Sequence, residues 1–156
     1  MANLEEEAEL ISVTSENPET LSTFLSLGRD YLSDLPAKAR EKFLRSILTR
    51  QGEPDRWLLI LKHRNECIGF IHMKIDRGER QGWGFILEFH IVPTKRKLGW
   101  GRGFFNLIVK ILKARGVKNI WLLTIPAVEQ FWYSLGFKET GEIDRETGQK
   151  IMVISI

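Results

Sequence analysis

Apolar and polar positions follow helical and strand periods in turn along the first third of the chain. Residues 9–14 alternate weakly, which predicts a first strand. Apolar residues then recur at helical spacing to about residue 32, after a predicted cap at Asn17-Pro18. A second helix is predicted to begin in the same way at residues 33–36 and to end at Gly52. The N-terminal third therefore predicts one strand and two helices.

Three apolar runs in the middle of the chain predict three consecutive strands, at residues 57–61, 67–75 and 83–92. A turn at residues 63–66 joins the first two, and a polar loop at residues 76–82 joins the second pair. Strands connected this closely pair antiparallel, because a parallel pair needs a crossover of a dozen or more residues.

Such a crossover follows the third run. An amphipathic helix is predicted from about Gly103 to Arg115, and the next strand from Asn119 to Thr124, which gives a parallel pair. A short helix from Pro126 to Gly136 and two closing strands, at about 137–143 and 149–156, complete the pattern. We therefore predict a single α/β (α+β) domain spanning residues 1–156, with a mixed six- to seven-stranded sheet flanked by about four helices.

The segment of residues 86–105 carries the clearest candidate chemistry. An apolar run ends at Pro93, a basic glycine-rich loop follows, and an amphipathic helix begins. The unpaired N–H groups at a helix start, with the positive end of the helix dipole, bind phosphates well. Gly99 and Gly101 lack the Cβ atoms that would keep a ligand from the backbone. The nearby positive charges are Lys95, Arg96, Lys97 and Arg102. The segment predicts a site for a phosphate-bearing cofactor.

Two familiar phosphate-binding loops do not fit this segment. A nucleoside-triphosphate loop needs Lys-Ser or Lys-Thr after its last glycine, and none follows here. A dinucleotide fingerprint needs an acidic residue about 20 positions further on, and no Asp or Glu occurs from Phe89 to Val128. A solvated basic turn and a nuclear-targeting or nucleic-acid patch are the alternatives that residues alone leave open.

A third kind of loop does fit. Residues 96–101 read Arg-x-x-Gly-x-Gly after Ile91-Val92-Pro93, and residues 131–137 read Phe-Trp-Tyr-Ser-Leu-Gly-Phe, with a helix and a strand between them. This pair of motifs resembles the GNAT superfamily of N-acetyltransferases. The resemblance covers residues 56–156 well and the N-terminal third by element order. It implies a splayed sheet and the direct transfer of an acetyl group from acetyl-coenzyme A to a primary amine.

The resemblance also implies roles for individual residues. Backbone N–H groups of residues 97–102 would hold the pyrophosphate, and the pantetheine arm would lie between the fourth and fifth strands. A backbone N–H near Ile91 would polarise the thioester oxygen. The cofactor-binding residues predicted in this way are Phe89, His90, Ile91, Arg96, Lys97, Leu98, Gly99, Trp100, Gly101, Arg102 and Trp132.

Glu88 is the most conspicuous candidate for the catalytic base, because it is a carboxylate in an otherwise apolar strand, where burial would raise its pKa. A paired structural carboxylate is the alternative explanation of this residue. Strand alternation places Glu88 opposite Phe89 and Ile91, and a β-bulge would reset that parity. His90 is more simply explained as a structural residue or a backbone contact. Glu129 is more simply explained as an exposed acid in the first turn of a helix.

The catalytic acid is harder to predict. The family usually has tyrosine where this chain has Trp132, and an indole N–H cannot titrate usefully. Tyr133 is the neighbouring candidate, although it lies about 100° further around the helix. The thiolate could instead leave unprotonated or take a proton from water. A non-catalytic acyl-coenzyme A sensor on the same fold is therefore the first alternative function, and a nucleic-acid-binding module the second.

The two N-terminal helices would border the acceptor in this family. Tyr31, Arg40 and Lys42 are therefore candidates to approach it, although a solvated helix face explains each more simply. The predicted acceptor is a small-molecule amine or a protein or peptide amine. Nucleic acid is disfavoured as a partner, and the resemblance leaves a homodimer open.

Composition narrows the class of protein. With 43% hydrophobic residues and no uninterrupted apolar run of about 18, the chain predicts an ordinary globule without a membrane span. The acidic N-terminus has no apolar signal region, and Cys67 is the only cysteine and a predicted core residue. These features predict a cytoplasmic protein. The histidines lie on separate predicted elements, so we expect no metal.

The net charge of +3 is unevenly distributed. Eight lysines or arginines lie between Phe89 and Val128, whereas glutamates gather at residues 5–9. This asymmetry favours an anionic partner at the middle segment, and coenzyme A with its phosphates meets that requirement.

Overall fold

The computed structural model describes residues 8–156, which divide into two compact units. The first unit contains the described residues up to His72 together with Glu88–Phe104, and the second contains Met73–Leu87 and Phe105–Ile156. The glutamates at residues 5–7 lie outside the described residues. The prediction of a single domain stays a prediction.

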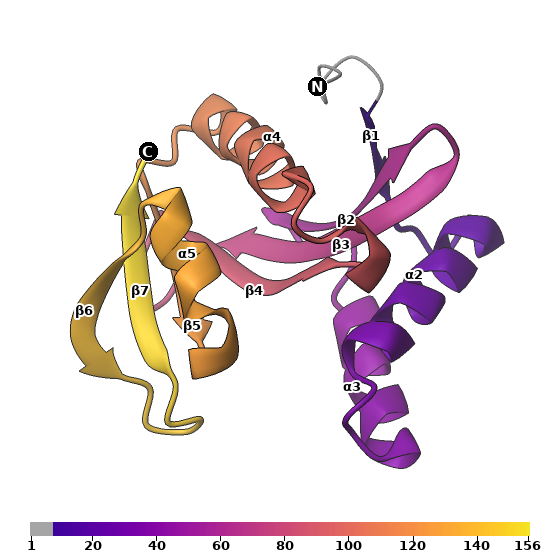
Figure 1. Ribbon diagram of the computed structural model, residues 1–156, viewed down its shortest axis with the longest axis horizontal. Helices are drawn as coiled ribbons and strands as arrows, with labels where there is room; N and C mark the ends of the chain where they lie inside the picture. Colours follow the sequence, from indigo (N-terminus) through magenta and orange to yellow (C-terminus); the bar gives the residue numbers. More distant parts are fainter. Residues whose placement is uncertain (1–7) are drawn as a thin grey trace. The chain divides into compact units, whose positions relative to one another are not determined.

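The described strands form a seven-stranded sheet in the order β1-β2-β3-β4-β5-β7-β6 (Figure 1). Two strands, β3 (Glu66–Ile75) and β4 (Gly84–Ile91), and the helix α4 (Trp100–Ala114) each run from one unit into the other. None of the described helices has the length and apolarity that crossing a membrane requires.

The first unit begins with β1 (Ala8–Ser12), which pairs antiparallel with β2 (Arg56–His63). Between them, α2 (Pro18–Tyr31) and α3 (Ala37–Leu48) lie side by side (Figure 1). A two-residue turn then leads from β2 into β3. The core of this unit lies between the helices and the strands, and its larger members are Phe24, Leu27, Leu44, Ile47, Leu58, Ile60 and Phe70.

Only one of the two predicted helix caps is confirmed. The Asn17 side chain accepts hydrogen bonds from Glu19 N and Thr20 N at 3.0 and 3.3 Å, as expected for α2. The second prediction is wrong, because Pro36 itself occupies the cap position of α3 and makes no side-chain cap. The end of α3 also differs: it stops at Leu48, and Gly52 lies in the turn beyond it.

The second unit contains the parallel part of the sheet. β4 pairs with β5 (Asn119–Thr124) from Gly84↔Ile120 to Ile86↔Leu122. β5 pairs antiparallel with β7 (Lys150–Ser155), which in turn pairs with β6 (Lys138–Ile143). The 3₁₀ turn η2 (Pro126–Val128) leads into α5 (Glu129–Leu135), which ends at left-handed Gly136. The predicted mixed sheet and its parallel pair are confirmed.

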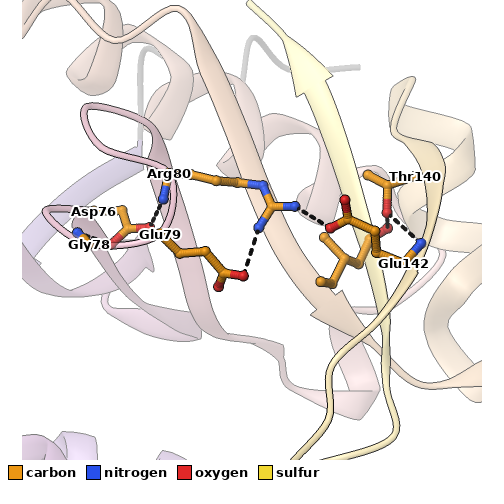
Figure 2. Close-up of polar contacts among 7 residues, drawn as sticks. Asp76, Gly78, Glu79, Arg80, Thr140 and Glu142 are labelled. Atoms are coloured by element: carbon orange, nitrogen blue, oxygen red, sulfur yellow. Dashed lines mark hydrogen bonds and ion pairs between the residues drawn. The ribbon is translucent and has the colours of Figure 1, made fainter.

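The loop between β3 and β4 is ordered by Asp76 and Arg80 (Figure 2). The Asp76 carboxylate accepts hydrogen bonds from Gly78 N and Arg80 N, at 2.9 Å each. The Arg80 guanidinium donates to Glu142 on β6 at 2.8 Å and lies 4.6 Å from the centre of the Trp121 ring. A single arginine thus joins the loop to β6 and covers an aromatic ring of β5.

We expect Arg80→Gln to lower the free energy of unfolding by about 1–2 kcal/mol, because it removes a shielded cation–π contact and an ion pair. Urea unfolding followed by circular dichroism measures this loss. Arg145→Gln, at an exposed turn position, is the matched control and should stay within about 0.5 kcal/mol of wild type. Equal losses of unfolding free energy in both variants would show that the contacts of Arg80 do not stabilise the protein.

Candidate active site

The loop before α4 has an unusual backbone conformation. It follows the 3₁₀ turn η1 (Pro93–Lys95), and both Lys97 (φ 63°) and Gly99 (φ 89°) are left-handed. Gly99 O accepts a hydrogen bond from Gly103 N at 3.0 Å, so Gly99 caps the helix. Alternation of left- and right-handed residues turns successive N–H groups toward one concave side, which suits an anion. The start of α4 at Trp100, one turn earlier than predicted, brings the helix N-terminus into this loop.

The side chains of the loop are not all available to a ligand. Arg96 Nε donates to Ile91 O at 2.8 Å, and Lys95 Nζ lies 2.5 Å from Glu66 Oε2. The Trp100 ring is buried and packs on His63 with 4.6 Å between ring centres. Lys97 and Arg102 are exposed. A bound phosphate would therefore meet mainly backbone N–H groups and the exposed Lys97 ammonium.

The side chains of β4 keep strict alternation only in part. Two positions of β4 face the same helix, α4. A Cβ on Gly84 would lie 2.9 Å from Leu112 Cδ1, and the Phe89 ring packs on the Phe104 ring with 5.3 Å between ring centres. Residues on one face of a regular strand are an even number apart, whereas these two are five apart. We infer one interruption of the bulge type between them. Glu88 still lies opposite Phe89, as predicted.

Glu88 meets Tyr31, the last residue of α2. The Tyr31 hydroxyl donates to Glu88 Oε2 at 2.8 Å, and its ring packs edge-on against Phe70 at 5.6 Å. Burial raises the pKa of Glu88 to about 7, while the hydrogen bond from Tyr31 acts in the opposite direction. Burial and the neighbouring carboxylate raise the pKa of Tyr31, so the hydroxyl stays a donor. The simpler explanation of Tyr31 as part of a solvated face is therefore wrong.

His90 lies beside this pair. Its Nε2 is 3.0 Å from Asp30 Oδ2, and its ring is 5.3 Å from that of Tyr31. Burial lowers the pKa of His90, against the opposing effect of Asp30. A neutral imidazole with this carboxylate partner carries its proton on Nε2 and donates it to Asp30. This arrangement supports the structural explanation of the His90 side chain.

The other candidates on α2 and α3 differ in exposure. Arg40 is half-buried, whereas Lys42 is exposed. Cys67 packs against the core of the first unit but stays half-buried, so the prediction of a buried core residue holds only in part. Within residues 8–156, no three His, Cys, Asp or Glu side chains gather as a metal site would require.

The second motif lies on α5 in the second unit. Trp132 is buried against Phe131 and Phe137, with ring centres 4.9 and 5.3 Å apart. The Tyr133 hydroxyl is hydrogen-bonded to Glu139, which raises the pKa of Tyr133. Its role as catalytic acid stays a prediction.

Glu129 differs from the expectation of an exposed acid. Its side chain is only 17% exposed and lies 3.2 Å from Lys150 Nζ, which also pairs with Glu139 at 2.8 Å. The ion pair with a lysine on the facing strand draws this first-turn carboxylate away from solvent.

Comparison with known proteins decides the family. The sequence model of the Acetyltransferase (GNAT) family matches residues 22–137, about three quarters of the chain. The chain belongs to this family. The resemblance seen in the two motifs is thereby confirmed, and so is the predicted class, an acyltransferase that uses acetyl-coenzyme A. No curated protein matches this acetyltransferase by sequence.

Solved structures show the same fold. The PaiA N-acetyltransferase from Thermoplasma acidophilum, solved with coenzyme A, has a TM-score of 0.73 and 20% identity, covering 96% of this chain and 99% of that one. An aminoglycoside 6′-N-acetyltransferase, also solved with coenzyme A, has a TM-score of 0.74 and 16% identity, with 94% and 96% covered. The ribosomal-protein-S18-alanine N-acetyltransferase from Escherichia coli gives 0.67 and 18%, with 96% and 94% covered. The GNAT-like fold is confirmed.

Sequence reasoning missed two contributions to this candidate site. The pairing of Tyr31 with Glu88 joins residues 57 positions apart, and no local pattern signals such a contact. Asp30 was missed for the same reason. The weak signal that existed was a tyrosine at the end of a predicted helix, in a chain with only two tyrosines.

Proposed function

We propose that this protein transfers the acetyl group of acetyl-coenzyme A to a primary amine by direct attack, with Glu88 as the base. The observation that carries the proposal is the half-buried Glu88 carboxylate, which is hydrogen-bonded to Tyr31 and whose pKa is raised to about 7. A general base works best when its pKa is near the working pH, because it is then both ionised and basic enough.

The reaction begins with loss of a proton, because an alkylamine with a pKa of about 10.4 is an ammonium ion at neutral pH. The Glu88 carboxylate accepts that proton, and Tyr31 holds the carboxylate in place. The amine nitrogen then attacks the thioester carbonyl carbon, and the C–S bond breaks. Coenzyme A leaves as the thiolate and takes a proton from water, while the new amide nitrogen releases its second proton to water. Glu88 then returns its own proton to solvent.

The donor would be held by the loop and by the end of β4. The N–H groups of residues 97–102 would bind the pyrophosphate, supported by the left-handed conformations of Lys97 and Gly99. Arg96 would act through its hydrogen bond to Ile91 O, which fixes the loop against β4. Backbone atoms of Phe89, His90 and Ile91 would pair with the pantetheine arm. The Ile91 N–H would donate to the thioester oxygen.

The acceptor is tested with an amine panel. Two of the similar structures are enzymes named for an aminoglycoside and for an alanine of ribosomal protein S18, so the panel includes an aminoglycoside and an alanine peptide together with a polyamine. Calorimetric titration with acetyl-coenzyme A comes first, followed by thiol release for each amine. Release of coenzyme A with one acceptor class supports the proposal. Tight binding without turnover on any amine would favour the acyl-coenzyme A sensor, and binding to random nucleic acid alone would favour the nucleic-acid-binding module.

Tyr31→Phe should move the pH dependence of this reaction. The Tyr31 hydrogen bond lowers the pKa of Glu88, so its removal raises that pKa further above its usual range. We expect the acid limb of kcat/KM to move to higher pH by roughly half to one unit, with the rate recovered at high pH. A pH–rate profile from pH 5.5 to 9.5 measures the shift. An unchanged midpoint would show that Tyr31 does not act on the group that titrates.

A further inference from the structure

Gly69, on β3 in the first unit, touches the backbone of β4 unusually closely. A Cβ at this position would lie 2.0 Å from His90 O, 3.0 Å from His90 C and 3.1 Å from Ile91 Cα. Real Cβ atoms essentially never come within 3.0 Å of another heavy atom. All three neighbours are backbone atoms, which cannot turn aside as the end of a side chain can. Only glycine allows β3 and β4 to meet in this way.

This contact sets the direction of one peptide group. In a trans peptide the C=O and the following N–H point in opposite directions. Since His90 O lies against β3, the Ile91 N–H points away from β3. The hydrogen bonds on either side agree: Val92 N donates back to Ile68 O at 2.9 Å, while Ile91 O accepts from Arg96 Nε at 2.8 Å. The Ile91 N–H is thus directed out of the β3–β4 ladder.

We propose that Gly69 is a positioning residue for acetyl transfer. By admitting the His90 carbonyl against β3, it aims the Ile91 N–H at the place where the thioester oxygen develops negative charge. This inference rests on the proposed function, in which Ile91 N–H is the donor to that oxygen. Gly69 lies outside both sequence motifs, about 20 residues before Ile91 along the chain.

The proposal separates binding from chemistry. A methyl group at position 69 forces the His90–Ile91 peptide to rotate or shift, which misdirects the N–H. Loss of one oxyanion donor costs a large factor in kcat, and a misdirected donor should cost about 10- to 100-fold. Affinity for coenzyme A, which has no acetyl carbonyl and is held by the loop, should change by less than about threefold.

The matched control is Gly84→Ala. Gly84 is also a strand glycine without a left-handed φ, but its added Cβ would meet Leu112 Cδ1 at 2.9 Å, the movable end of a side chain. Both variants should lose stability. Only Gly69→Ala should lose kcat when each variant is assayed at least 15 °C below its own Tm. The measured quantities are kcat, KM for the best acceptor, and Kd for coenzyme A and for acetyl-coenzyme A.

A measurement on the wild type covers the case in which Gly69→Ala does not fold. The Ile91 amide resonance should shift on addition of acetyl-coenzyme A and much less with coenzyme A, because only the former brings a carbonyl oxygen. A shift of equal size with both would overturn the inference.

The outcomes separate this inference from the proposed function. Wild type that turns over, with equal kcat in the two glycine variants, overturns the role of Gly69 alone. Wild type that binds acetyl-coenzyme A but acetylates no amine overturns the proposed function and this inference with it. A kcat loss confined to Gly69→Ala, with coenzyme A affinity kept, supports both.

Discussion

Replacing Glu88 by glutamine should lower kcat at pH 8 by about 10²- to 10³-fold, the usual contribution of a general base. The amide keeps the shape of the side chain, and its oxygen can still accept the Tyr31 hydrogen bond of 2.8 Å. It cannot accept a proton from the amine. KM for acetyl-coenzyme A should change little, since Glu88 lies opposite Phe89 on the strand rather than in the phosphate-binding loop.

The pH dependence gives an independent check. With the pKa of Glu88 raised to about 7, the wild-type rate should rise as pH passes through 7 and level off above it. Glu88→Gln should lose this limb, leaving only the ionisation of the amine. The pH–rate profiles of both proteins, measured with the same acceptor, test this expectation.

Glu88→Gln should lower kcat at pH 8 but should not lower the free energy of unfolding at that pH. The folded-state pKa of Glu88 is raised, so the folded protein binds this proton more tightly than the unfolded chain does. That contribution is complete below the unfolded pKa and is lost as pH rises through about 7. At pH 8 Glu88→Gln should therefore be as stable as wild type or more stable, by up to about 3 kcal/mol.

The control for this variant is Glu16→Gln, an exposed carboxylate of the first unit, which should keep full activity. If Glu88→Gln kept more than half of the wild-type kcat across the pH range, Glu88 would not be the base.

Gly101→Glu should weaken binding of acetyl-coenzyme A by at least about 100-fold, because like charges brought together cost several kcal/mol and each 1.4 kcal/mol is a factor of ten. Gly101 lies in the first turn of α4, two residues after the capping residue Gly99. The new carboxylate would occupy the N-terminal end of the helix, where a phosphate would accept hydrogen bonds from the unpaired backbone N–H groups. Calorimetric titration measures the change.

Misfolding is an unsuitable explanation for such a loss, because a carboxylate in the first turn of a helix is stabilising. Asn106→Glu is the matched control: it adds the same charge at an exposed position further along the same helix. Its affinity should stay within about threefold of wild type, since the added charge is exposed and screened by salt. Equal losses in both variants would indicate a general charge effect, and unchanged binding in Gly101→Glu would remove the loop from the cofactor site.

The order of elements could be predicted from the sequence because each strand and helix has its own hydrophobic period. The start of α4 was placed one turn late, because glycines at 99, 101 and 103 have low helix propensity and look like a loop.

The residues of the candidate site likewise differ in whether a local sequence pattern could predict them. The proposed cofactor loop is a contiguous motif, so it could be predicted from the sequence alone. Tyr31, Asp30 and Gly69 could not, because each contacts a segment that is distant in the sequence. Which cations of the loop are already engaged was also beyond the sequence. Lys95 and Arg96 have partners within the protein, Glu66 and Ile91 O, that no spacing rule would indicate.

The left-handed conformation of Lys97 has a consequence for protein engineering. A lysine at φ 63° costs about 1 kcal/mol that glycine would not. Directed evolution that selects only for thermostability would favour glycine at position 97. The enriched variants would be more thermostable but would have one fewer cation at the proposed cofactor loop. A library of variants of this protein should therefore be screened for acetyl-coenzyme A binding in the same round as for thermostability.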